Sequence, residues 1–172
     1  MLFGDGAGAV VMGPAEEDGH GILATYGASD GSLRDLLLQY GGGSAMPASQ
    51  ETVEKNFHTI AMFGNEVFKH AVRCMEEAAM KALEISGIPM NKLNWLIPHQ
   101  ANIRIIDFLA RRLLLPMEQV VVTIDKYGNT SSASVPISLD EAVRDGRIKR
   151  GDSVLLVAFG AGFTWGSVMM RW

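Results

Sequence analysis

The sequence contains only one cysteine, Cys74, among its 172 residues. A single thiol cannot form an internal disulfide bond, and it cannot build a zinc site from several thiolates. His20 and His58 have no cysteine or carboxylate neighbours at the spacing of metal ligands. The sequence therefore indicates a chain from a reducing compartment, and we expect no metal site.

Blocks of charge and long hydrophobic runs are also missing. Fifteen basic and nineteen acidic residues give a net charge of −4, which argues against a broad surface for nucleic acid. The longest apolar runs, such as residues 154–159, fall far short of the roughly 20 residues that a membrane helix needs. The first residues also lack the features of a signal peptide. We expect a cytoplasmic protein without nucleic-acid or membrane partners.

Apolar residues make up 48% of the sequence, which is enough for a sizeable core. Glycine and proline separate the apolar segments at regular intervals. Residues 51–86 show a helical pattern with Gly64 as a break, ended by Gly87 and Pro89. Strands and helices then alternate, which predicts an α/β layer with a mixed sheet and helices on its faces. The expected strands are 2–12, 21–28, 95–98, 120–124, 153–159 and 163–171, and the later helices are 103–114 and 134–145.

In open α/β sheets, ligands bind beyond the carboxyl ends of the strands, so the loops at these positions are the places to inspect. The first, residues 98–102, reads Pro-His-Gln-Ala-Asn and follows an apolar strand. His99 could donate a hydrogen bond or act as a base near neutral pH. The alternative is that Asn102 caps the next helix and His99 is a buried polar residue with satisfied hydrogen bonds.

The other two loops are rich in small residues. Residues 127–134 contain Asn129, whose amide could donate to a carbonyl oxygen that gains negative charge, although a turn with an N-cap is the better explanation of this loop taken by itself. Residues 159–166 contain Gly160 and Gly162, which could expose backbone N–H groups towards an oxyanion. A tight connection between strands would also explain these glycines.

Taken in order, these loops resemble one known family. The segments His-Gln-Ala-Asn, Gly-Asn-Thr-Ser-Ser-Ala-Ser and Gly-Ala-Gly-Phe-Thr-Trp-Gly, with Gly-Asp-Gly-Ala-Gly-Ala-Val-Val near the start, resemble β-ketoacyl-acyl-carrier-protein synthase III. The resemblance implies a thiolase-like α/β fold with one mixed five-stranded sheet and helices on both faces. It covers only the C-terminal half of that fold. Residues 1–172 would form this half-domain, and the N-terminal half with the nucleophilic cysteine would be absent.

The activity implied by the resemblance is an acyl transfer that initiates fatty acid synthesis. Acetyl-CoA and malonyl-acyl carrier protein would be joined by decarboxylative Claisen condensation, with the coenzyme A thioester as substrate and no cofactor. His99 and Asn129 would be the catalytic residues that stabilise the enolate of the malonyl thioester. The backbone N–H of Ala161 would form part of the oxyanion hole, which requires a negative φ at this alanine.

Substrate contacts are implied as well. Contacts with coenzyme A and its pantetheine arm would come from Gly64, Asn65, Phe68, Ala101 and Asn102, although a helix start with Phe68 in the core is the alternative for any one of them. Basic residues on the helix at 103–114 would attract the acidic carrier protein, or would simply be solvated charges. These residues are Arg104, Arg111 and Arg112, with the role assigned to Arg104 in particular.

Two alternatives concern what this chain could do by itself. His70 and Cys74 share a helix face and could form a nucleophilic dyad, but N–H groups in mid-helix are already bonded and cannot form an oxyanion hole. A buried cysteine that packs as a small hydrophobe is the ordinary outcome. We expect this chain alone to be inactive in condensation, and the full-length enzyme to be a homodimer. The second alternative is a non-catalytic module that binds coenzyme A or acyl carrier protein.

Overall fold

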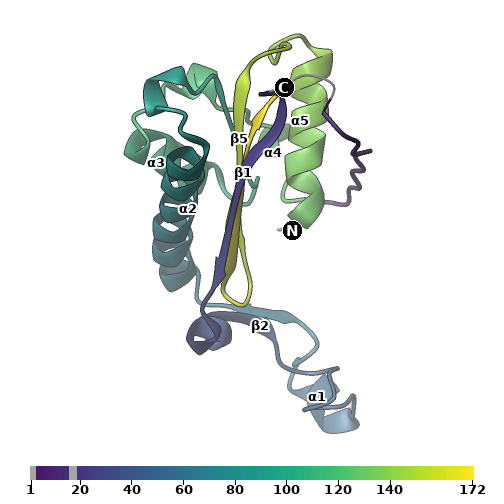
Figure 1. The fold of residues 1–172 in the computed structure, drawn as a ribbon. Helices are drawn as coiled ribbons and strands as arrows, with labels where there is room; N and C mark the ends of the chain where they lie inside the picture. Colours follow the sequence, from purple (N-terminus) through teal and green to yellow (C-terminus); the bar gives the residue numbers. More distant parts are fainter. Residues whose placement is uncertain (1–2, 16–18) are drawn as a thin grey trace.

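A computed structural model describes residues 3–15 and 19–172. Its centre is a four-stranded sheet in the order β1-β6-β5-β4 (Figure 1). β5 pairs in parallel with β4 and antiparallel with β6, and β6 pairs antiparallel with β1, so the sheet is mixed. The strands are β1 (Gly21–Ser29), β4 (Trp95–Pro98), β5 (Ser153–Gly160) and β6 (Thr164–Arg171).

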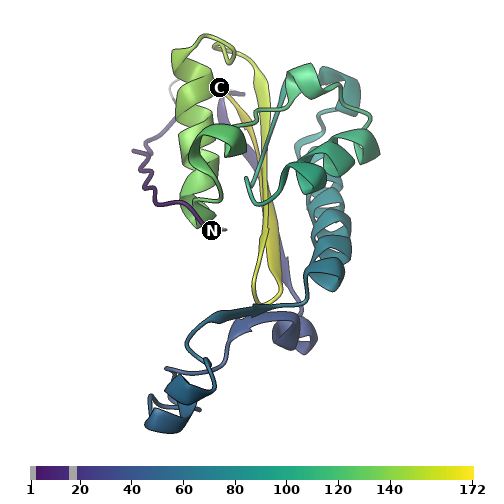
Figure 2. The same ribbon diagram turned by 180° about the vertical axis from the view of Figure 1, so that it is seen from behind.

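Helices cover both faces of this sheet, as the sequence pattern predicted (Figures 1 and 2). α2 (Gly64–Ser86) and α3 (Ile103–Arg112) lie on one face, and α5 (Ser134–Arg144) lies on the other. Alanines on the buried side of α2 bring its backbone close to the sheet, and Gly87 ends the helix with φ 68°. The alanines are Ala71, Ala78, Ala79 and Ala82.

An arm extends from one end of the sheet, between β1 and α2 (Figures 1 and 2). It contains a 3-10 turn at Gly31–Leu36, and a two-stranded ladder of β2 (Leu37–Gln39) and β3 (Ile60–Met62). α1 (Gln50–Glu54) lies between these two strands in the sequence. The helical pattern at 51–86 therefore belongs to two helices, and Gly64 begins the second one. Further short elements are 3-10 turns at Met90–Lys92, Met117–Gln119 and Ser131–Ala133, and α4 (Ile124–Tyr127).

The prediction of five strands in the main sheet is wrong, and residues 120–124 show one reason. Val120 makes only an isolated bridge with Leu96. The backbone N–H groups of Thr123 and Ile124 then donate to the side chain of Gln100, at 2.8 and 3.1 Å. Because a side chain takes these donors, no strand ladder continues along the segment.

The strand expected at 2–12 is not formed either. Leu2 lies outside the described residues, and Phe3 makes an isolated bridge with Asn129. The chain from Gly4 follows α5 (Figure 1), and it packs so closely that a Cβ atom on Gly8 would lie 2.5 Å from Pro136 Cγ. Glycine permits this approach. Further along, the side chains of Val10, Val11 and Met12 are exposed.

None of the described helices is both long enough and apolar enough to cross a membrane. Within residues 3–15 and 19–172, no three histidine, cysteine, aspartate or glutamate side chains gather as a metal site would require. Two apolar cores hold the layers together, one between the sheet and α2 and α3, and the other between the sheet and α5.

Candidate active site

A cavity of about 870 Å³ opens beside α5, over the sheet. His99 reaches it from the end of β4, and Ser131 and Ser132 reach it from the loop that carries Asn129. Gly160, at the end of β5, borders the same space. The structure therefore brings together parts of all three loops that the sequence singled out. The apolar part of the wall comes from Val135, Pro136, Leu156, Phe159, Trp165 and Val168, among others.

His99 is held at both its backbone and its ring. Its N–H donates to the carbonyl oxygen of Val157 at 2.8 Å, which extends the pairing of β4 with β5 by one residue. Its ring Nδ1 lies 2.7 Å from Oγ of Ser134, the first residue of α5. Burial lowers the pKa of His99 below 6.5, because the charged imidazolium loses its hydration. Burial of the ring therefore favours its neutral form.

Gln100 connects the His99 loop to the segment that leads to Asn129. Its side chain is fully buried, at 1% exposure. Nε2 donates to the carbonyl oxygens of Pro98 and Val121, and Oε1 accepts from the N–H groups of Thr123 and Ile124. All four hydrogen bonds of the amide are thus made, which fixes both segments relative to each other.

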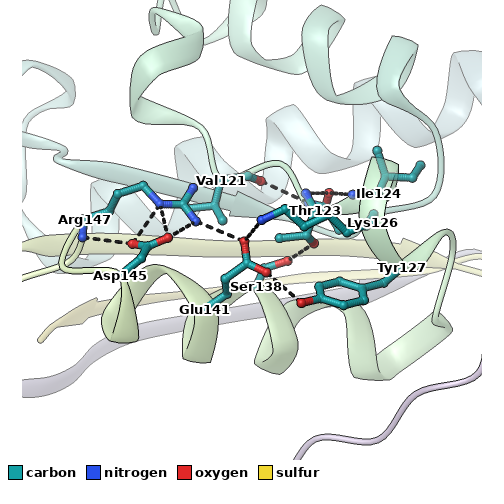
Figure 3. Close-up of polar contacts among 10 residues, drawn as sticks. Val121, Thr123, Ile124, Lys126, Tyr127, Ser138, Glu141, Asp145 and Arg147 are labelled. Carbon is teal, nitrogen blue, oxygen red and sulfur yellow. Dashed lines mark hydrogen bonds and ion pairs between the residues drawn. The ribbon is translucent and has the colours of Figure 1, made fainter.

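A polar network joins residues 123–127 to α5 (Figure 3). Thr123 Oγ1 lies 2.7 Å from Ser138 Oγ, both buried. Glu141 accepts from Lys126 and from the hydroxyl of Tyr127, and Arg147 adds a weaker contact with it. The bond from Lys126 lowers the pKa of Glu141, and the bond to Glu141 raises the pKa of Tyr127. α4 is therefore anchored on α5 just before Asn129.

Asn129 is 8% exposed and follows Gly128, whose φ is 68°. Its side-chain Oδ1 accepts from the backbone N–H of Ser131 at 2.9 Å, and its own carbonyl oxygen accepts from Gly4 N–H at 2.8 Å. The amide nitrogen takes no part in either bond. The turn expected from the sequence is present, and it orients the amide.

Ala161 lies in the turn between β5 and β6, next to Gly160 of the cavity wall. The φ angle of Ala161 is not positive, as an oxyanion-hole N–H from an alanine requires. One residue further along, the peptide bond between Gly162 and Phe163 is cis. Asp30 closes this end of the sheet by exchanging two backbone hydrogen bonds of 2.8 Å with Phe163.

The residues assigned to pantetheine and the carrier protein lie on the other side of the sheet, on α2, on α3 and in the loop that leads into α3. Phe68 packs edge-on against Phe108 with ring centres 6.1 Å apart, and the Arg104 guanidinium lies 5.6 Å from the Phe68 ring centre. Asn102 caps α3 by accepting from the N–H of Arg104. Gly64 and Asn65 are exposed at the start of α2, and Ala101 is half-buried. None of these residues borders the cavity that His99 borders.

The three arginines of α3 differ in their partners. Arg111 pairs with Asp107 at 2.8 Å, and Arg112 pairs with Glu76 of α2 at the same distance. Across the described part of the chain, no carboxylate forms an ion pair with Arg104. Of the three arginines, only Arg104 therefore has a charge that no carboxylate of the described residues neutralises.

Cys74 lies in the core between α2 and the sheet, at 2% exposure. Burial raises the pKa of its thiol. No hydrogen bond joins it to His70 in the described structure; the His70 ring lies against Phe163 instead, at 5.6 Å. The arrangement does not support a nucleophilic dyad, and it fits a packed hydrophobe.

Sequence reasoning did not find Ser134 or assign a role to Gln100. Serine at a helix start is commonplace, and its distance from His99 depends on how α5 packs. Gln100 did carry a signal: an amide two residues after an apolar strand has to satisfy its hydrogen bonds within the protein if it is buried there.

Comparison with known proteins places this arrangement in a family. Residues 83–172 match the family model described as the C-terminal part of 3-oxoacyl-[acyl-carrier-protein] synthase III. The chain belongs to the 3-oxoacyl-acyl-carrier-protein synthase III family. The resemblance seen in the three loops is thereby confirmed.

Individual members of the synthase III family match over the whole chain. The chain is 54% identical over 172 residues to β-ketoacyl-[acyl-carrier-protein] synthase III of Clostridioides difficile, and 55% identical to that of Caldanaerobacter subterraneus. It covers 52% of each, so it spans about half the length of these curated relatives. The crystal structure of 3-oxoacyl-[acyl-carrier-protein] synthase III from Aquifex aeolicus aligns with 92% of the chain, at TM-score 0.78 and 45% identity, and the chain covers 46% of it.

Proposed function

We propose that this chain is the C-terminal part of a condensing enzyme that joins acetyl-CoA and malonyl-acyl carrier protein. The observation that carries the proposal is that His99 borders a cavity that is also bordered by Ser131 and Ser132, in the loop that carries Asn129. In the proposed site, the His99 ring and the Asn129 amide would each donate an N–H to the same substrate oxygen. Membership of the synthase III family supports the choice of substrates.

The reaction needs such donors because decarboxylation leaves an electron pair on the substrate. The bond between the α-carbon and the carboxylate of the malonyl thioester breaks, CO₂ leaves, and the electron pair becomes an enolate. The enolate carbon then attacks an acyl group held on a cysteine, the new C–C bond forms, and the thiolate leaves. His99 and Asn129 would donate to the enolate oxygen without losing their protons, and each preorganised donor is worth roughly 3 to 4 kcal/mol.

The Ala161 N–H would stabilise the second oxyanion, which forms when the acyl-cysteine is attacked. The pantetheine arm would lie on the α2 and α3 side of the sheet, along Gly64, Asn65 and Phe68, and its thioester would reach His99 at the end of β4 by passing Ala101 and Asn102. The exposed charge of Arg104 would face the acidic carrier protein, with Arg111 and Arg112 in support. No cofactor is required by this scheme, because the thioesters themselves carry the reacting groups.

The nucleophile is the one group that this chain does not supply in the described structure, since Cys74 is buried away from the cavity. We place it in a first half of the thiolase-like fold, which is in keeping with relatives about twice as long. The lone chain would then be inactive in condensation, and the complete enzyme would act as a homodimer in the cytoplasm.

The direct experiment is to measure formation of 3-oxoacyl product from acetyl-CoA and malonyl-acyl carrier protein. The assay is run on the lone chain and on a complemented mixture, in which a separately made first half supplies the nucleophilic cysteine. We expect activity only in the mixture. His99→Ala or Asn129→Ala would each lower kcat by about 10²- to 10³-fold.

Matched controls are His58→Ala and Asn91→Ala, which remove the same groups far from the cavity and should retain activity. Activity in the lone chain would contradict the proposal. Binding of coenzyme A or carrier protein without any turnover, with both halves folded, would favour the alternative of a non-catalytic binding module.

A further inference from the structure

The hydrogen bond between His99 and Ser134 poses a question of direction. A neutral imidazole carries one proton, on either Nδ1 or Nε2, and only the protonated nitrogen can donate. The distance of 2.7 Å between Nδ1 and Ser134 Oγ fits both directions. If Nδ1 carried the proton, Nε2 could not donate to a substrate oxygen, and His99 could not act as proposed.

A second contact of the same hydroxyl group resolves the direction. Ser134 Oγ also lies 3.2 Å from the backbone N–H of Gln100, which can only donate. Ser134 is 2% exposed, so bulk solvent does not reach its hydroxyl group. Among the described residues, His99 Nδ1 is the only acceptor that the structure gives to this hydroxyl. If Nδ1 donated instead, the hydroxyl would receive two N–H groups and its own proton would be buried without a partner, which is costly.

We propose that Ser134 is a positioning residue that fixes His99 in its Nε2–H tautomer. The Gln100 N–H donates to Ser134 Oγ, the Ser134 hydroxyl donates to Nδ1, and the proton of the ring is held on Nε2. The inference deepens the proposed function, because this tautomer has its donor on the nitrogen that is free to meet a substrate oxygen.

The position of Ser134 is itself well fixed. It begins α5, and one turn later Ser138 bonds Thr123, which in turn bonds Gln100 Oε1. Gln100 therefore supports His99 through two routes: its backbone N–H orients the Ser134 hydroxyl, and its side chain sets the register of the neighbouring segment. The Ser134 hydroxyl thus belongs to a hydrogen-bonded chain of four residues, none of which is charged.

The test is ¹⁵N NMR of histidine-labelled protein near pH 8, in solution or, where the chain associates, in the sedimented state. The shifts of the two ring nitrogens report which of them carries the proton, and His99→Gln assigns the signals. We expect unprotonated Nδ1 and protonated Nε2 in the unaltered chain. Ser134→Ala should shift the tautomer ratio about tenfold towards Nδ1–H, the effect of losing one hydrogen bond.

Ser167→Ala is the matched control, because Ser167 is also buried but donates to Ala78 on the other side of the sheet. It should leave the His99 signals unchanged. Ser134→Thr keeps the hydroxyl and should retain the Nε2–H tautomer. A protonated Nδ1 in the unaltered chain would overturn the proposal whether or not Ser134→Ala folds, as would an unchanged ratio in a folded Ser134→Ala chain. Neither result requires condensation activity, so failure of this inference is distinguishable from failure of the proposed function.

Discussion

Gln100 Oε1 accepts a hydrogen bond of 2.8 Å from the backbone N–H of Thr123, across 23 positions of the sequence. This bond joins the two segments that carry His99 and Asn129. It also ends the strand-like course of residues 120–124, because it takes a backbone donor that a sheet would need. The buried Gln100 amide thus limits the strand pairing of residues 120–124 and also fixes the segments that carry His99 and Asn129 relative to each other.

Replacing Gln100 with leucine should destabilise the chain strongly. The change leaves the Thr123 and Ile124 N–H groups and the Pro98 and Val121 carbonyls without their partner, and a buried unsatisfied group costs about 1 to 3 kcal/mol. We expect the free energy of unfolding, measured with urea, to fall by at least about 4 kcal/mol, about 1 kcal/mol or more for each of the four groups. Gln50→Leu, on the exposed side of α1, should change it by less than about 0.5 kcal/mol. Equal effects of the two substitutions would refute the role of Gln100.

The stability of the chain should fall as the pH falls below 6.5. Burial lowers the pKa of His99 in the folded state, so the unfolded chain binds a proton that the folded chain does not. The free energy of unfolding therefore decreases with acidity in this range, until the folded pKa is passed. Urea unfolding at about pH 7.5 and 5.5 would measure the slope. His99→Gln should reduce it, and an identical slope in the variant would show that His99 is not the group responsible.

Cys74 should be inert in the folded chain. Its pKa is raised by burial, and both thiolate formation and reagent access are needed for reaction. We expect a thiol reagent to label it only after unfolding. Cys74→Ala should retain the activity of the complemented mixture at a stability cost of about 1 kcal/mol. A tenfold loss of activity in a folded variant would reopen the question of a nucleophile on α2.

Arg104 and Arg111 should differ in their effect on carrier-protein binding. Arg104 has no carboxylate partner in the described structure, whereas Arg111 is paired with Asp107. Arg104→Ala should raise KM for malonyl-acyl carrier protein about tenfold at low salt, and less at high salt because of screening. Arg111→Ala should change KM less than threefold. Similar changes in both variants would remove the distinction drawn from their ion pairs.

Much of the architecture could be predicted from local patterns. The boundaries of β4 and the stop of α2 at Gly87 follow from apolar runs and turn residues, and the structure agrees with both. The helix expected at 134–145 also forms, as α5. Local signals of this kind act over a few residues, so they survive without knowledge of the tertiary contacts.

The features that were predicted wrongly or not at all depend on contacts between residues that are distant in the sequence. Residues 120–124 have the apolar pattern of a strand, but the Gln100 side chain takes two of their backbone donors. Residues 3–12 have a strand pattern too, yet they pack against Tyr127, Thr130 and Pro136 through glycines. For the site, the three loops could be chosen from sequence because the ends of strands meet at one edge. The partner of His99 could not, because it depends on the packing of α5.

The central claim is that His99 and Asn129 stabilise the enolate, and the most direct measurement is the rate of CO₂ release from malonyl-acyl carrier protein. The nucleophilic cysteine of the first half is replaced in the complemented mixture, so that decarboxylation is observed without condensation. We predict that CO₂ release persists, and that His99→Ala and Asn129→Ala each reduce it by about 10²- to 10³-fold while His58→Ala does not. Unchanged CO₂ release in both variants would contradict the account.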